Sequence, residues 1–305
     1  MRRWIAVVMA ALAVGVGAAC PARRPAADPT YTADIERQRS QRLAELTSDT
    51  GWLTLVGIHW LKPGANRLGA DPGNDIVLHG DGVPAFAGEL DSTADGTVIL
   101  RARPDAAATV GGEPVTTVTL RSDRQGTPVI VEIAGLRLNV IERGGSRALR
   151  VRDPRSPRRA GFKGIQYFPI DPRLRVQAVL ERYDAPREVT VASAQGPAQR
   201  MLAPGLLRFR IGTTECSLEP FAESAETGSL FIVFSDETAG RETYGAGRFL
   251  DADAPAPGTS AVILDFNLAY NPPCVFTPYA TCPLPPARNV LPVAIEAGEK
   301  DSGDH

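Results

Sequence analysis

Short apolar runs separated by Gly, Asp and Pro turns recur along most of this chain, and they constrain its fold more than any other feature. Between residues 66 and 120 three runs stand out, at Asp75–Leu78, Thr97–Leu100 and Val115–Leu120. The 26 prolines and 29 glycines supply the turns that this alternation of runs and turns requires. Because short runs at this spacing are typical of β-strands in a sandwich, the sequence predicts a mainly β protein containing a β-sandwich.

One segment near the start has a different pattern. Residues 31–47 place Ile35 and Leu46 among charged side chains, which is the spacing of an amphipathic helix. Thr32 or Asp34 is expected to cap its first turn, because short polar side chains accept hydrogen bonds from free backbone amides there.

The order of these elements divides the 305 residues into five segments. They are a lipoprotein-type signal peptide (1–20), a tether (21–30), a helix with a β-sandwich (31–143), a second β-rich module with a Cys-Pro C-terminal segment (144–300) and a loose tail (301–305).

The first 20 residues carry a targeting signal. Arg2 and Arg3 precede the apolar run Trp4–Val16, and Gly17-Ala18-Ala19 then leads to Cys20. This pattern predicts a lipoprotein signal, with Cys20 lipidated and the protein membrane-anchored in the cell envelope, facing the periplasm or the exterior. An ordinary cleaved secretory signal is the alternative, because Gly17 stands where lipoprotein signals usually have Leu.

Charge and motif content exclude several classes of function. The net charge is −2, so the chain lacks the positive field that nucleic-acid binding needs. No G-x-S-x-G, Walker A, H-E-x-x-H or dinucleotide fingerprint is present. His59 and His79 are the histidines of the predicted folded part, and no C-x-x-C pair accompanies them. We therefore expect neither a metal site nor a cofactor.

The segment Val262–Lys300 begins as a strand and breaks at Asn271-Pro272-Pro273, because proline donates no backbone hydrogen bond. A second short strand is expected after the prolines. Cys274 and Cys282 lie within this segment, and an oxidising compartment favours a disulfide between them. Two unpaired buried thiols are the alternative, and a catalytic thiol is a third possibility.

Two groups of polar residues are candidates for a site. Asp265 shares a strand face with Asn267, and with Tyr244 and Arg248 it would supply the acid or base of a hydrolase. The alternative is that Asp and Asn side chains bond the free backbone groups around the proline pair, where Asn271 starts the turn.

Arginines around residue 150 form the second group. Arg150 and Arg152 share one face of a predicted strand, and arginine binds carboxylate or phosphate in a bidentate way. Together with Asn267 and Asn271 they are the candidate ligand-binding residues for an anionic small molecule or envelope polymer. The alternative is a solvated face whose arginines pair with acids such as Asp153.

Residues 52–143 resemble a forkhead-associated (FHA) domain. The turns at Leu68-Gly69, Asn74–Leu78 and Val110–Val115 fall in the order of that family's motifs. That resemblance implies a β-sandwich fold. The phosphothreonine-binding Arg and Ser-x-x-His of the family have no counterpart, since Ala70 follows Gly69 and Val83–Phe86 occupies the second position. It therefore implies no phosphopeptide site.

The blocks WLTLVGIHWLKPGANRLG, LRVRDPRSPRRAGFKGIQYFPID, FSDETAGRETYGAGRFL and DFNLAYNPPCVFTPYATCPLPPARNVLPVAIEAGEK resemble the bacterial proteins of domain of unknown function 1684. This resemblance spans Trp52–Lys300 and implies an envelope or secreted β-rich protein, without catalytic assignments. We therefore expect a non-catalytic ligand-binding or interaction module, with a hydrolase using Asp265, Tyr244 and Arg248 as the alternative.

Overall fold

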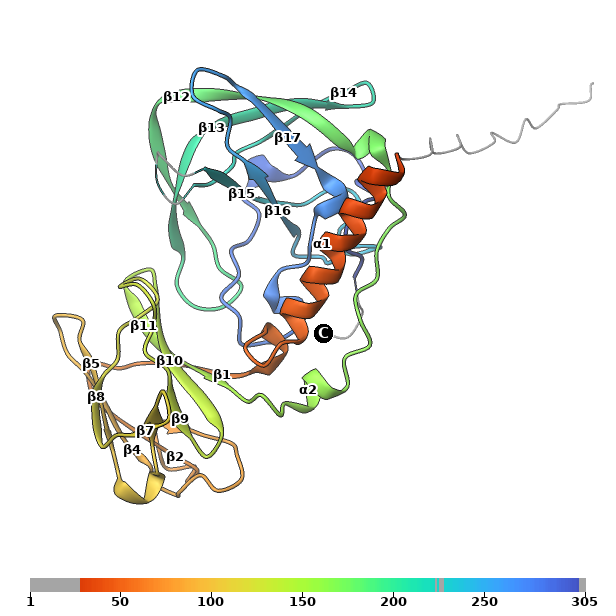
Figure 1. The fold of residues 1–305 in the computed structure, drawn as a ribbon. Coiled ribbons are helices and arrows are strands. Elements are labelled where there is room, and N and C mark those ends of the chain that lie inside the picture. Colours follow the sequence, from red (N-terminus) through yellow and green to blue (C-terminus); the bar gives the residue numbers. More distant parts are fainter. Residues whose placement is uncertain (1–27, 223, 225–227, 302–305) are drawn as a thin grey trace, which may run out of the picture.

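The computed structural model describes residues 28–222, 224 and 228–301. It confirms a mainly β protein with an N-terminal helix, a β-sandwich and a second β-rich module (Figure 1). The predicted lipidation site, Cys20, lies outside the described residues. Within the described part, no helix is both long and apolar enough to cross a membrane.

The helix α1 (Pro29–Thr47) begins earlier than the sequence suggested. Asp28 caps it by accepting hydrogen bonds from the amides of Thr30 and Tyr31, at 2.7 and 3.3 Å. The prediction of Thr32 or Asp34 as the cap is therefore wrong. Pro29 accounts for the difference, because proline suits the first turn of a helix, where its missing N–H is not needed.

The helix packs against the second module, not against the sandwich that follows it in sequence (Figure 1). The Tyr31 hydroxyl donates to Asp265 at 2.8 Å, and the Arg42 guanidinium donates to the carbonyl of Asn271 at 3.0 Å. Helical periodicity identifies a buried face, but it carries no information on which module covers that face.

Two sheets form the sandwich. The first contains β1 (Leu55–Trp60), β11 (Ser146–Arg152), β10 (Leu136–Arg143), β9 (Val131–Ile133), β6 (Thr109–Val110) and β7 (Glu113–Pro114) in spatial order. The second contains β3 (Ile76–Val77), β2 (Gly64–Gly69), β4 (Gly88–Ser92), β5 (Val98–Ala102) and β8 (Thr117–Thr119). Leu90 and Leu100 from one sheet meet Val131, Leu138 and Leu149 from the other in a buried core.

The sandwich extends past the predicted boundary at residue 143. Strand β11 is antiparallel to β10 on one side and to β1 on the other, so the sandwich ends at Arg152. The turn Gly144-Gly145 has positive φ at both residues, 54° and 78°, which lets β10 fold back directly into β11. The boundary moves because this pair of glycines is a hairpin turn within the sandwich.

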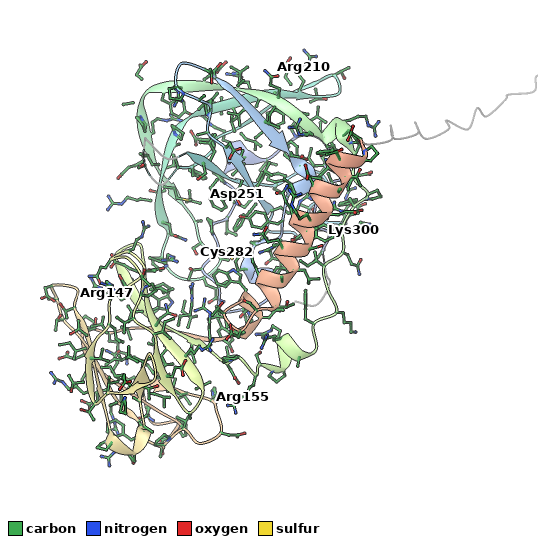
Figure 2. The ribbon with its side chains drawn as sticks, in the orientation of Figure 1. Arg147, Arg155, Arg210, Asp251, Cys282 and Lys300 are labelled. Atoms are coloured by element: carbon green, nitrogen blue, oxygen red, sulfur yellow. The ribbon has the colours of Figure 1, made fainter. Side chains whose placement is uncertain are left out.

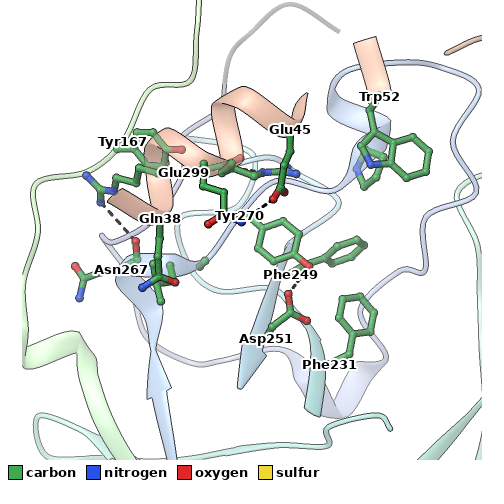
Figure 3. A pocket seen from close by; sticks show the side chains of 16 residues that line it. Gln38, Glu45, Trp52, Tyr167, Phe231, Phe249, Asp251, Asn267, Tyr270 and Glu299 are labelled. Atoms are coloured by element: carbon green, nitrogen blue, oxygen red, sulfur yellow. Dashed lines mark hydrogen bonds and ion pairs between the residues drawn. The ribbon is translucent and has the colours of Figure 1, made fainter. Parts of the chain in front are cut away.

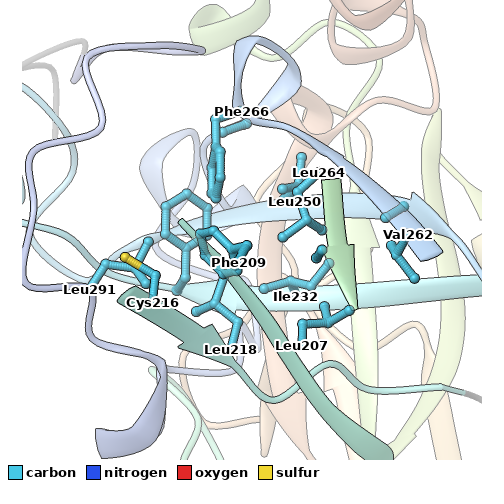
Figure 4. Packing of buried hydrophobic residues seen from close by; sticks show 14 of the residues in the cluster. Leu207, Phe209, Cys216, Leu218, Ile232, Leu250, Val262, Leu264, Phe266 and Leu291 are labelled. Carbon is cyan, nitrogen blue, oxygen red and sulfur yellow. The ribbon is translucent and has the colours of Figure 1, made fainter. Parts of the chain in front are cut away.

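The second module consists of two further sheets. One contains β14 (Thr214–Leu218), β13 (Gln199–Ile211), β12 (Arg175–Val191) and β17 (Ala261–Asp265), and the other pairs β15 (Ser229–Phe234) with β16 (Arg248–Asp253). Leu207, Phe209 and Leu264 of the larger sheet pack against Ile232 and Leu250 of the smaller one (Figure 4). This core is separate from that of the sandwich.

Short helical turns connect the strands. They are η1 (Trp52–Thr54), η2 (Pro104–Ala106), α2 (Pro157–Ala160), η3 (Pro172–Leu174), η4 (Phe266–Leu268), η5 (Pro273–Val275) and η6 (Ala287–Asn289). The last three lie in the segment after β17, where the second predicted strand is absent from residues 266–301. Prolines remove ladder donors there, and buried Asn289 holds the chain by donating to the carbonyls of Glu219 and Val233, each at 2.9 Å.

Candidate ligand-binding cleft

Asp265, the proposed catalytic acid or base, is engaged in structural contacts. Its carboxylate accepts from the Tyr31 hydroxyl and from the backbone amide of Asn267, the latter at 3.1 Å. The Asn267 side chain is fully buried and bonds both the amide and the carbonyl of Asp171, at 2.8 and 2.9 Å. These contacts agree with the alternative in which Asp265 and Asn267 satisfy backbone groups.

Arg248 is completely buried, with 1% of its surface exposed. It forms an ion pair of 2.8 Å with Asp236 and donates to the carbonyls of Ile295, Ala297 and Glu299. Arg248 therefore ties the C-terminal segment to β16.

Tyr244 belongs to a third network, where its hydroxyl hydrogen-bonds to the Cys274 thiol. It packs near Leu46, Leu53 and Phe276. The structure therefore separates the three proposed catalytic residues, because each side chain serves a different structural contact. Strand periodicity suggested one face for Asp265 and Asn267 only, and β17 ends at Asp265, where η4 begins.

Cys274 and Cys282 come together as predicted, but as free thiols. The backbone amide of Cys274 donates to the Cys282 sulfur at 3.1 Å. Hydrogen bonds from Cys282 and Tyr244 lower the pKa of Cys274. The disulfide stays a prediction, and a free-thiol count on the isolated protein tests it.

Asn271 is buried at the break in the chain and holds the C-terminal segment. Its amide donates to the Glu299 carboxylate at 2.8 Å, and its side-chain nitrogen donates to the carbonyl of Lys300 at 2.7 Å. Its proposed role in ligand binding has no support from these contacts. Among residues 28–222, 224 and 228–301, no group of three or more His, Cys, Asp and Glu side chains could hold a metal ion.

A cleft of about 560 Å³ lies beside Asn271, between α1 and the strands β15 and β16 (Figure 3). Five aromatic side chains line it together with polar groups from α1. The aromatic residues are Trp52, Tyr167, Phe231, Phe249 and Tyr270. Pockets of this size and mixed character are typical of small-molecule sites.

Aromatic packing fixes the floor of the cleft. Phe249 makes edge-to-face contacts with Phe231 and Tyr270, at centroid distances of 4.9 and 5.8 Å. Phe249 is itself buried, whereas Phe231, Tyr270 and Trp52 each keep part of their surface open. Phe249 therefore holds the partly open rings of Phe231 and Tyr270 in place.

Arginines from α1 form one wall of the cleft. Arg39 lies 4.2 Å above the Tyr167 ring and Arg42 lies 4.9 Å above the Tyr270 ring. Arg42 also forms an ion pair of 3.2 Å with Glu299. Burial raises the pKa of Glu299, and Arg42 partly offsets that effect. These contacts attach the helix to the second module and set the shape of the wall.

Asp251 is one of the two exposed acids that line the cleft, and Glu45 is the other. The Tyr270 hydroxyl donates to its carboxylate at 2.8 Å, while no ion pair joins it to another described residue (Figure 3). Desolvation by the surrounding protein raises the pKa of Asp251, although part of the side chain faces solvent. Asp251 can accept hydrogen bonds from a ligand, and it is the cleft's best candidate for proton transfer.

The predicted arginine pair lies behind this cleft. Arg150 and Arg152 point from β11 toward Trp52, with guanidinium carbons 5.0 and 6.0 Å from its ring centroid. Arg152 donates to the side-chain oxygen of Asn139 at 3.0 Å. Burial lowers the pKa of Arg150 to about 9, with a further contribution from Arg152. The alternative of a solvated face is wrong for Arg150, which is 6% exposed.

The family model described as "Protein of unknown function (DUF1684)" matches residues 160–300. A solution NMR structure of the uncharacterized protein from gene locus rrnAC0354 of Haloarcula marismortui is 33% identical to this chain, and the match covers 48% of this chain and 81% of that one, with a TM-score of 0.41. Residues 160–300 therefore belong to the DUF1684 family. Comparison with curated proteins gives no match.

Two FHA domains are similar to part of this DUF1684 protein. The FhaA FHA domain, solved with the intracellular domain of Rv3910, is 16% identical and covers 30% of this chain and 96% of its own, with a TM-score of 0.22. A domain studied for phosphothreonine-dependent FHA interactions is 18% identical and covers 32% and 96%, also with a TM-score of 0.22. The assignment of a β-sandwich therefore rests on the two sheets described above and not on these similarities.

The cleft residues of the DUF1684 protein were largely missed at the sequence level. Phe231 and Asp251 face each other on the paired strands β15 and β16, but Trp52 comes from η1, far away in the sequence. The last family block ends in AGEK and therefore contains Glu299, which lines the cleft. Nothing in the sequence indicated that Glu299 pairs with Arg42.

Proposed function

We propose that this DUF1684 protein is a lipid-anchored cell-envelope module that binds a saccharide in the cleft between α1 and β15–β16. The observation that carries the proposal is the set of partly open rings, Trp52, Phe231 and Tyr270, beside the carboxylate of Asp251. The C–H faces of a sugar ring pack on aromatic side chains, and its hydroxyl groups donate to carboxylates.

The polar residues of α1 support a ligand with many hydroxyl groups. Gln38 and Gln41 line the cleft next to Glu45, and they supply both donors and acceptors. Glu45 accepts a hydrogen bond of 2.9 Å from Gln41, which orients both side chains. The charge of Arg42 on this wall is already balanced by its ion pair with Glu299.

The expected location supports the same class of ligand. Lipidation at Cys20 would hold the folded part at the membrane surface through the tether 21–30, among the polymers of the envelope. A module without a catalytic motif can serve there by holding one of those polymers.

Isothermal titration calorimetry with soluble oligosaccharides prepared from bacterial cell walls tests this proposal. Trp52→Leu is expected to weaken binding about 10-fold, or about 1.4 kcal/mol, because it removes one stacking face. Trp60→Leu is the matched control, since Trp60 does not line the cleft. Absence of binding to the folded wild-type protein would overturn the proposal.

Hydrolysis of a glycosidic bond is the second candidate, and Asp251 is the observation that favours it. A carboxyl group with a raised pKa beside a tyrosine hydroxyl is suited to general acid catalysis. If the cleft is catalytic, Asp251→Asn should abolish the release of reducing ends while leaving ligand binding intact. If wild-type protein releases no reducing ends from any oligosaccharide that it binds, this candidate fails.

A further inference from the structure

Arg150 is a buried charge without a partner. Its side chain is 6% exposed, and no hydrogen bond or ion pair joins its guanidinium to another described residue. Buried charges in proteins are normally paired, because removal from water is costly. The structure of the described part therefore leaves the hydrogen-bonding groups of Arg150 available.

The neighbouring charges do not neutralise it. Arg143 is paired with Asp123 at 2.7 Å, and Arg147 is 3.7 Å from Glu142. Arg152 has an amide partner, Asn139, in place of a carboxylate. After these pairs are formed, Arg150 and Arg152 remain as two positive charges on one face of β11.

Neighbours of the two arginines line two cavities. Trp52, whose ring covers both guanidinium groups, lines the aromatic cleft. Asp123 and Arg143, close enough for their charges to act on Arg150, line a second cavity of about 940 Å³. The two cavities are neighbours, because Phe231 and Asp251 line both of them.

Cys282 of the second module lies close to Arg150. The charge of Arg150 acts on the Cys282 thiol, and Figure 2 shows Cys282 at the end of the second module that faces the sandwich. The two arginines therefore lie where the two modules meet, and Arg152 keeps part of its surface open.

We propose that Arg150 and Arg152 form an oxyanion subsite, which binds a carboxylate, phosphate or sulfate group of the ligand whose sugar rings occupy the cleft. This proposal rests on the proposed function and narrows it to acidic saccharides. Paired guanidinium groups are well suited to such anions, because each offers parallel N–H donors to two oxygens. Burial lowers the pKa of Arg150, and a bound anion would favour its charged form.

Thermal melting in the presence of inorganic phosphate tests the subsite by itself. Phosphate should raise the melting temperature of the wild-type protein beyond the effect of chloride at equal ionic strength, because it binds only the folded state. Arg150→Met should weaken the apparent affinity for phosphate at least 10-fold, and Arg152→Gln should also weaken it. Arg208→Met is the matched control, since Arg208 is an exposed arginine paired with Glu181.

The subsite proposal is wrong if phosphate raises the melting temperature of the wild type and of both subsite variants equally. It is also wrong if phosphate does not raise the melting temperature of the wild type. If Arg150→Met does not fold, the Arg152→Gln variant decides by the same criterion.

A second pair of titrations separates the two proposals. A cell-wall oligosaccharide carrying a phosphate or carboxylate should bind the wild type at least 10-fold more tightly than its neutral counterpart, and Arg150→Met should remove that difference. Trp52→Leu should weaken both ligands. If phosphate stabilises through Arg150 but neither oligosaccharide binds, the saccharide proposal fails and the bound oxyanion is free phosphate. If both bind equally and Arg150→Met changes neither, the subsite fails alone.

Discussion

Arg248→Met is expected to cost about 3–5 kcal/mol of the free energy of unfolding, which is the usual effect of breaking a buried ion pair. Arg248 and Asp236 are each 1% exposed in their side chains and lie 2.8 Å apart. The substitution removes the charge that balances Asp236, and it also leaves the carbonyls of Ile295 and Ala297 without a donor. Methionine fills a similar volume, so the loss reflects the polar contacts and not a cavity.

Urea denaturation followed by circular dichroism measures this cost. Arg208→Met is the control, because Arg208 and Glu181 are about half exposed and such pairs contribute little to stability. We expect no measurable change in the control. If Arg248→Met unfolds at the same urea concentration as the wild type, the assignment of Arg248 as a structural tie is wrong, and a functional role has to be reconsidered.

Three further predictions concern the C-terminal segment and the anchor. Asn271→Ala should lower the unfolding free energy by about 1–3 kcal/mol, because the Lys300 carbonyl loses its donor; unchanged melting contradicts this. Burial raises the pKa of Glu299 above 4.5, so the folded state keeps this proton to higher pH than the unfolded state does, and its contribution to stability falls as pH rises above 4.5. Glu299→Gln should flatten that fall in denaturation series from about pH 4 to pH 7, whereas parallel curves refute it. Metabolic labelling with a fatty-acid probe should tag the protein, and the tag should disappear in Cys20→Ser; a tag that persists rules out this anchor.

Local patterns in the sequence predicted most of the fold. The alternation of apolar runs with turns located the sandwich, and helical spacing located α1 to within two residues. Both patterns depend on residues that are close together in the sequence, so they can be recognised without the structure. The boundary at residue 143 was wrong because the Gly144-Gly145 turn looks the same inside a domain as between domains.

The site was harder to predict because it depends on distant contacts. Asp265, Tyr244 and Arg248 had suitable chemistry, but each is used to hold the chain together. The cleft is assembled when α1 crosses the second module and Trp52 reaches over β11, and neither event leaves a local pattern. The arginine pair was found because its two members share one strand, where a spacing of two residues places both on one face.

The fluorescence of Trp52 during titration with cell-wall oligosaccharides tests the central claim most directly. The chain has three tryptophans, so a mature protein beginning at Cys20 and carrying Trp60→Phe keeps Trp52 as the single reporter within the cleft. If a saccharide occupies the cleft, the emission of Trp52 should shift and saturate with added oligosaccharide, and Asp251→Ala should weaken the response. An emission spectrum that does not change up to millimolar ligand would contradict the account.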